Sequence, residues 1–123
     1  ILRRLVGSEM CIRDRSTPAN FNDGMLIDIM TDVSNSLIGK ENVVAVEPQM
    51  VGEDFARYGS TKEDIPTAMY WLGTVPKERM DRYISGEYAL PALHSPFYYP
   101  DIENSIRTGV KVSTESLIKL FNN

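Results

Sequence analysis

The sequence predicts an α/β fold in which helices cover a layered sheet. Apolar residues recur at helical spacing over residues 23–38 and again after residue 101. Between them lie two runs that suit strands, residues 42–46 and residues 67–73. Helix, strand, short helix, strand, loop and helix therefore follow one another along the chain, an order that is typical of layered α/β domains.

The first helix is expected over residues 23–38. Residues 16–21 form an extended lead, because Pro18 disfavours helical geometry at the residue before it. Asn22 or Asp23 then caps the helix, and Gly39 suits its C-terminal end. The expected apolar face consists of Leu26, Ile29 or Met30, Val33 and Leu37.

The middle of the chain is expected to alternate strands and turns. The β-branched run 42–46 predicts a strand or an extended segment, and residues 53–58 predict one or two helical turns closed by Gly59. Residues 67–73 are apolar on both faces, which is typical of an interior strand covered by helices. Residues 77–83 predict a short helix or an ordered excursion.

The C-terminal part is expected to hold a long loop and a last helix. Residues 89–100 contain three prolines and the only histidine, and irregular loops of this length carry function more often than connection. Asp101 is expected to cap the last helix, which contains Gly109. Its expected buried stripe is Ile106, Val110, Leu117 and Leu120 or Phe121.

Composition excludes several classes of protein. The 123 residues are 42% hydrophobic and 24% charged, which is ordinary for one globular domain. A net charge of −4 argues against a nucleic-acid or anionic-membrane partner, and no apolar run approaches the length of a membrane span. The single cysteine allows neither an internal disulfide nor a four-cysteine metal site.

Residues 1–15 are expected to be an artefact of sequence assembly. Residues 5–15, LVGSEMCIRDR, resemble a translated sequencing-library adapter of the transposase-insertion type, and we exclude the segment as one excludes a tag. It carries four arginines, one Glu, one Asp and the only cysteine, Cys11. The other 108 residues then hold 9 basic and 15 acidic side chains, a net of −6.

Two short motifs could carry chemistry. Gly52 lets a backbone approach a ligand closely, and Glu53 and Asp54 could bind cations or act as bases. Taken alone, this motif is better explained as a helix N-terminus with two acids that suit its dipole. His94, followed by Ser95 in the rigid loop, could be a metal ligand, although a lone histidine is usually structural or solvated.

Taken together, these motifs resemble one enzyme family. The chain is similar to the C-terminal part of the metal-dependent amidohydrolase and carboxypeptidase family, which includes hippurate hydrolases, N-acyl-amino-acid amidohydrolases and auxin-conjugate hydrolases. The resemblance covers residues 16–123. Its motifs are Pro18-Ala19, Asn22-Asp23, Gly39, Glu41 to Val44, Met50 to Phe55, Tyr58, Pro66, Leu72-Gly73, Leu93 to Pro96 and Gly109.

The resemblance implies a fold, a cofactor and a site. Residues 16–123 would be the C-terminal half of a layered α/β/α zinc-peptidase-like catalytic domain, with the first half and a lid used for dimerisation preceding Ser16. Two divalent metal ions, zinc or manganese, would activate water to cleave the amide bond of N-acyl amino acids or small peptides. His94 would be a metal ligand, and Gly52, Glu53, Asp54 and Ser95 would line or support the pocket.

One histidine does not make a catalytic site. Zinc sites need about three protein ligands, and the family's base Glu is expected in the missing half, so we expect the fragment alone to be inactive. The longer charged excursion from Lys77 to Tyr88 leaves the substrate open. The alternative is a non-catalytic α/β module that binds a small molecule or a protein through Trp71, Tyr98 and Tyr99. The full-length enzyme is expected to be a homodimer, with its compartment unassigned and the cytoplasm slightly favoured.

Overall fold

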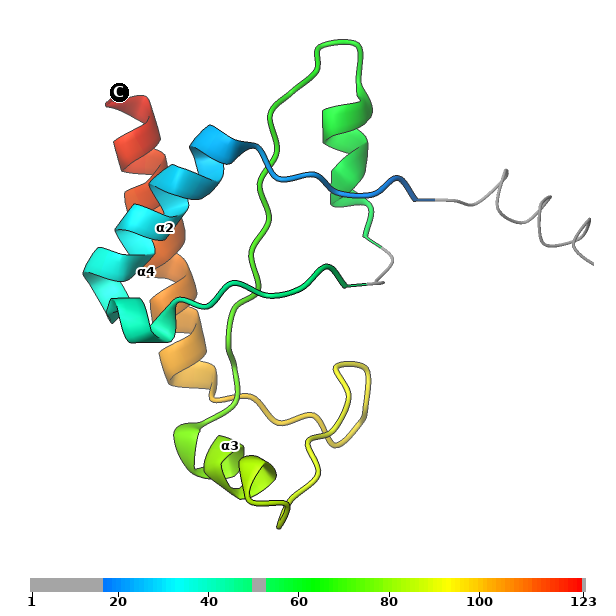
Figure 1. Ribbon diagram of the computed structural model, residues 1–123, viewed down its shortest axis with the longest axis vertical. Coiled ribbons are helices and arrows are strands. Elements are labelled where there is room, and N and C mark those ends of the chain that lie inside the picture. The colour runs from blue at the N-terminus through cyan, green and yellow to red at the C-terminus, as the bar shows by residue number, and fades with distance from the viewer. Residues whose placement is uncertain (1–16, 50–52, 123) are drawn as a thin grey trace, which may run out of the picture. The chain divides into compact units, whose positions relative to one another are not determined.

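The computed structural model describes residues 17–49 and 53–122 (Figure 1). Its α-helices are α2 (Gly24–Ile38), α3 (Lys77–Ile84) and α4 (Ile102–Phe121). Two shorter 3-10 helices are η2 (Lys40–Asn42) and η3 (Phe55–Ser60). Extended and turn segments connect them, and none of the described residues forms a strand. The predicted α/β class is therefore wrong, because the described part of the chain is helical.

The two predicted strands are extended segments without a backbone ladder. Val44 and Val46 are exposed, and so is Trp71, at 49% of its surface, which an interior strand would cover. A single backbone bond reaches the second run, from the Asp23 N–H to the Thr67 carbonyl at 2.7 Å. A strand needs successive backbone pairs along its length, and the described residues supply no such series here.

The chain divides into two compact units. The first contains the described residues 17–28, 45–49 and 53–69, and the second contains residues 29–44 and 70–122. The division falls inside α2, so this helix contributes to both.

The first unit is held by polar contacts between residues 22–23 and residues 67–69. The Asn22 carboxamide donates to the Met69 carbonyl at 2.9 Å and accepts from the Met69 N–H at 2.8 Å. It thereby pairs with the backbone as a neighbouring strand would. Thr67 is buried, and a Cβ on Gly59 would lie 3.2 Å from its Oγ1. Gly59 therefore lies inside η3 and closely against Thr67, rather than ending the helix as predicted.

In the second unit, residues 70–74 run along α4 in the opposite direction. The Tyr70 hydroxyl bonds to the Ser113 hydroxyl at 3.0 Å, and the Thr74 carbonyl accepts from the Asp101 N–H at 2.8 Å. Between them, a Cβ added at Gly109 would lie 3.1 Å from Leu72 Cδ2. The missing side chain at Gly109 thus lets the extended segment lie close to the helix.

This contact decides which face of α4 is buried. The buried residues are Ser105, Val112 and Ser116, which share a face with Gly109. The predicted stripe was wrong at Ile106, Val110, Leu117 and Phe121, all of which are exposed, while Leu120 is half-buried. Gly109 permits the close approach of Leu72 because it has no side chain, and Val112, one turn further on the same face, is 2% exposed.

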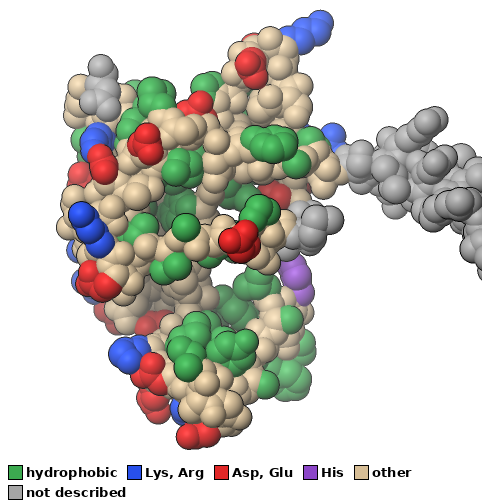
Figure 2. Space-filling view, in the orientation of Figure 1, with side chains coloured by type: hydrophobic (Ala, Val, Ile, Leu, Met, Phe, Trp, Pro, Cys, Tyr) green, Lys and Arg blue, Asp and Glu red, His purple; other side chains and the backbone are tan. Residues whose placement is uncertain are grey.

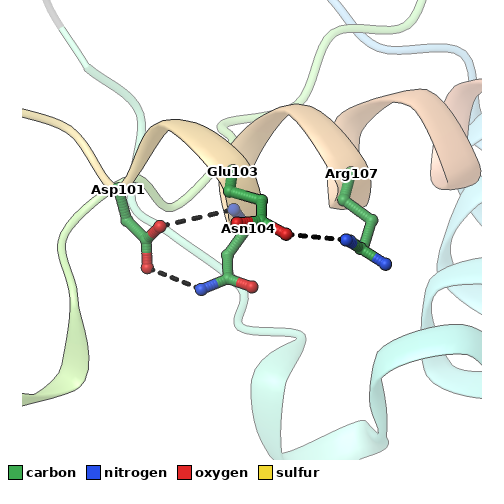
Figure 3. A network of polar contacts seen from close by, with 4 residues as sticks. All are labelled: Asp101, Glu103, Asn104 and Arg107. Atoms are coloured by element: carbon green, nitrogen blue, oxygen red, sulfur yellow. Dashed lines mark hydrogen bonds and ion pairs between the residues drawn. The ribbon is translucent and has the colours of Figure 1, made fainter.

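Several local predictions are confirmed. Asp23 caps α2, its Oδ1 accepting from the Leu26 N–H at 3.0 Å, and Ile29 and Val33 are buried as predicted, although Leu37 is exposed. Asp101 caps α4 through Asn104, whose N–H and side-chain amide both donate to its carboxylate, at 3.3 Å and 2.8 Å (Figure 3). The short helix α3 and the irregular segment over 89–100 also form.

Candidate functional site

His94 lies in a loop built from two consecutive turns. The Ser95 N–H donates to the Ala92 carbonyl at 2.9 Å, and the Tyr98 N–H donates to the Ser95 carbonyl at 3.0 Å. The Ser95 hydroxyl also accepts from the Phe97 N–H at 3.2 Å. Ser95 is therefore shared by both turns, and the backbone of His94 is held inside the first of them.

The same loop is tied to the rest of its unit. The Tyr98 hydroxyl forms a hydrogen bond with the Thr74 hydroxyl, and both residues are partly buried. The Arg79 guanidinium of α3 lies 5.3 Å from the centre of the Tyr99 ring, a cation–π contact. The loop is thus irregular in shape and yet anchored at adjacent tyrosines.

The His94 side chain itself is exposed (Figure 2). Its ring makes no hydrogen bond or ion pair with another described residue, so a ring nitrogen is available as a metal ligand. The described residues contain no group of three His, Cys, Asp or Glu side chains placed to hold a metal ion. The geometry therefore suits one metal ligand and does not by itself make a complete metal site.

The acidic motif has local partners. Glu53 Oε1 accepts from the Phe55 N–H at 3.1 Å, and Asp54 Oδ1 lies 3.7 Å from Arg57 Nε, within one turn of η3. Both acids are exposed and belong to the first unit, whereas His94 and Ser95 belong to the second. These contacts are those of a helix N-terminus, the simpler interpretation of the motif. Gly52 lies outside the described residues.

The sequence interpretation missed one residue of the loop anchor. The sequence predicts Tyr98 only as an aromatic contact residue and gives no role to Thr74. The two are 24 positions apart, and hydroxyl pairs at such a separation leave no spacing pattern in a sequence. The sequence offers only a run of aromatic residues in a proline-rich loop. Such a run indicates that the loop packs against other residues, but it does not identify them.

None of the helices in the described part of the chain is both long and apolar enough to cross a membrane. Comparisons of the chain with models of protein families, with curated proteins and with solved structures found no match. The candidate site is therefore defined by its residues and their geometry alone.

Proposed function

We propose that this chain contributes the metal ligand His94 to a dinuclear metal-dependent amidohydrolase acting on N-acyl amino acids or small peptides. The observation that carries the proposal is the exposed His94 imidazole, which has no partner among the described residues although its backbone is fixed in a turn. A metal ligand needs both an accessible ring nitrogen and a constrained position. The ordered family-like motifs around it supply the reaction class.

The residues of the chain would then have distinct tasks. His94 would hold one of two divalent ions, zinc or manganese, and these ions would supply polarisation of the amide carbonyl and an activated water. Ser95 would keep the backbone of His94 in its turn through its three hydrogen bonds. Glu53 and Asp54 are given no part in the chemistry, because their contacts are those of a helix N-terminus.

The remaining ligands and the general base would come from other parts of a longer, homodimeric protein. A zinc site generally requires about three protein ligands, and His94 is the only histidine of the sequence. The 123-residue chain by itself is accordingly expected to show no metal-dependent hydrolysis of N-acyl amino acids.

Replacement of His94 tests the proposal in the protein encoded by the complete reading frame. We expect His94→Ala to lower both the bound metal per chain and the turnover of N-acyl amino acids, because a ligand is lost. Lys77→Ala is the control, since it removes only an exposed ion pair with Asp81. Unchanged metal content and turnover in His94→Ala would remove His94 from the site and refute the proposal.

Exposed aromatic residues favour one other function. Tyr99 and Trp71 are 70% and 49% exposed, as contact residues of a non-catalytic binding module would be. The reading frame upstream separates the two functions. A His-x-Asp or Cys-x-His motif followed by a Glu-Glu pair supports the hydrolase, and a stop codon or an unrelated domain supports the binding module.

A further inference from the structure

Thr74 makes two hydrogen bonds to the C-terminal side of the His94 loop. Its hydroxyl bonds to the Tyr98 hydroxyl, and its carbonyl accepts from the Asp101 N–H at 2.8 Å. Residues 98–101 are therefore fixed to the segment that runs along α4. Thr74 thus fixes the positions of both Tyr98, in the loop, and Asp101, at the start of α4.

Tyr98 connects Thr74 to the two turns around His94. Its N–H donates to the Ser95 carbonyl, while its hydroxyl contacts Thr74. Ser95 in turn donates its own N–H to Ala92 across His94. A continuous chain of hydrogen bonds therefore links Thr74 to the turn that contains His94. The neighbouring Tyr99 hydroxyl makes no hydrogen bond to another described residue, although its ring contacts Arg79.

We propose that the hydroxyl pair of Thr74 and Tyr98 positions His94 for metal binding, an inference that rests on the proposed function. The pair would act through the loop backbone and would not itself be a metal ligand. When the metal-binding side chain is already held in place, less conformational entropy is lost as the metal binds. Residues that orient a metal ligand in this way commonly change metal affinity when they are replaced.

Adjacent tyrosines allow a matched test of the anchor in the 123-residue chain. We expect Tyr98→Phe to speed hydrogen exchange at the Ser95 and Tyr98 amides about fivefold, because one hydrogen bond is lost. Tyr99→Phe removes the same atom without removing a bond and should leave both rates unchanged. Thr74→Val should reproduce the effect of Tyr98→Phe, and Thr74→Ser, which keeps the hydroxyl, should restore slow exchange. Equal rates in Tyr98→Phe and Tyr99→Phe would overturn the proposal.

Zinc affinity of the protein from the complete reading frame provides the second measurement. We expect Tyr98→Phe to weaken zinc binding about tenfold, with Tyr99→Phe at the wild-type value. If exchange speeds up but zinc affinity does not change, the anchor exists and its positioning role is refuted, while the proposed function stands. If His94→Ala also keeps its zinc, the proposed function fails and this inference fails with it.

Discussion

Asp101 caps helix α4 with its carboxylate and also bonds through its backbone to a distant segment. Its carboxylate accepts two hydrogen bonds from Asn104, and its backbone N–H donates to Thr74. The next pair along the helix is Glu103 with Arg107, at 2.8 Å, and it is exposed (Figure 3). A cap bonds to a helix N–H that has no partner within the helix. The charges of an exposed ion pair are already well solvated, so their pairing adds little stability. The cap should therefore contribute more to stability than the ion pair.

We expect Asp101→Ala to lower the free energy of unfolding by about 1 kcal/mol, because the first turn of α4 loses its cap. Asp101→Asn should cost much less, since asparagine also caps helices well. Glu103→Ala should cost about 0.3–0.5 kcal/mol. Urea denaturation followed by circular dichroism measures all three. A larger loss in Glu103→Ala than in Asp101→Ala would contradict this ranking.

At the scale of the elements, the Asn22 side chain makes hydrogen bonds that a neighbouring strand would otherwise make. Asn22 precedes α2 and pairs through both its amide hydrogen and its oxygen with the backbone of Met69. The run 67–73 therefore gains part of a strand's hydrogen bonding without forming a sheet. This explains how an extended segment is held where no described strand lies beside it.

We expect Asn22→Ala to speed hydrogen exchange of the Met69 amide and to destabilise the first unit by about 1–2 kcal/mol, because two hydrogen bonds are lost. Asn22→Asp should also be destabilising, because its carboxylate keeps the acceptor and faces the Met69 carbonyl without a donor. Asn35→Ala is the matched control, since the Asn35 side chain bonds to no other described residue. Unchanged Met69 exchange in Asn22→Ala would show that the pairing does not hold the segment.

At the scale of the whole molecule, little apolar surface is buried. The buried apolar residues of the described chain are Ile29, Val33, Ala56 and Val112, and none of its large side chains is fully buried. Apolar residues on one side of α4 remain open to solvent, with Phe121 at 83%. Exposed apolar surface of this extent favours association.

We expect the isolated chain to self-associate as its concentration rises, and Val110→Lys with Leu117→Lys to weaken that association by placing charge on the exposed stripe of α4. Glu115→Lys makes the same change in net charge at an exposed position on another side of the same helix and should have a smaller effect. Sedimentation velocity over a range of concentrations measures the change. A wild-type chain that stays monomeric throughout would contradict the expectation.

Local sequence patterns alone predict α2, α4, the cap at Asp101 and the irregular loop around His94, and they narrow the cap of α2 to Asn22 or Asp23. These depend on hydrogen bonds between residues three or four positions apart, which leave a local pattern. Contacts between distant segments determine that residues 42–46 and 67–73 form no strand, that α4 buries Ser105, Val112 and Ser116, and that Thr74 anchors Tyr98. Strand pairing, the choice of buried face and the anchor of a loop depend on which distant segment lies alongside, and periodicity within one segment carries no information about that partner.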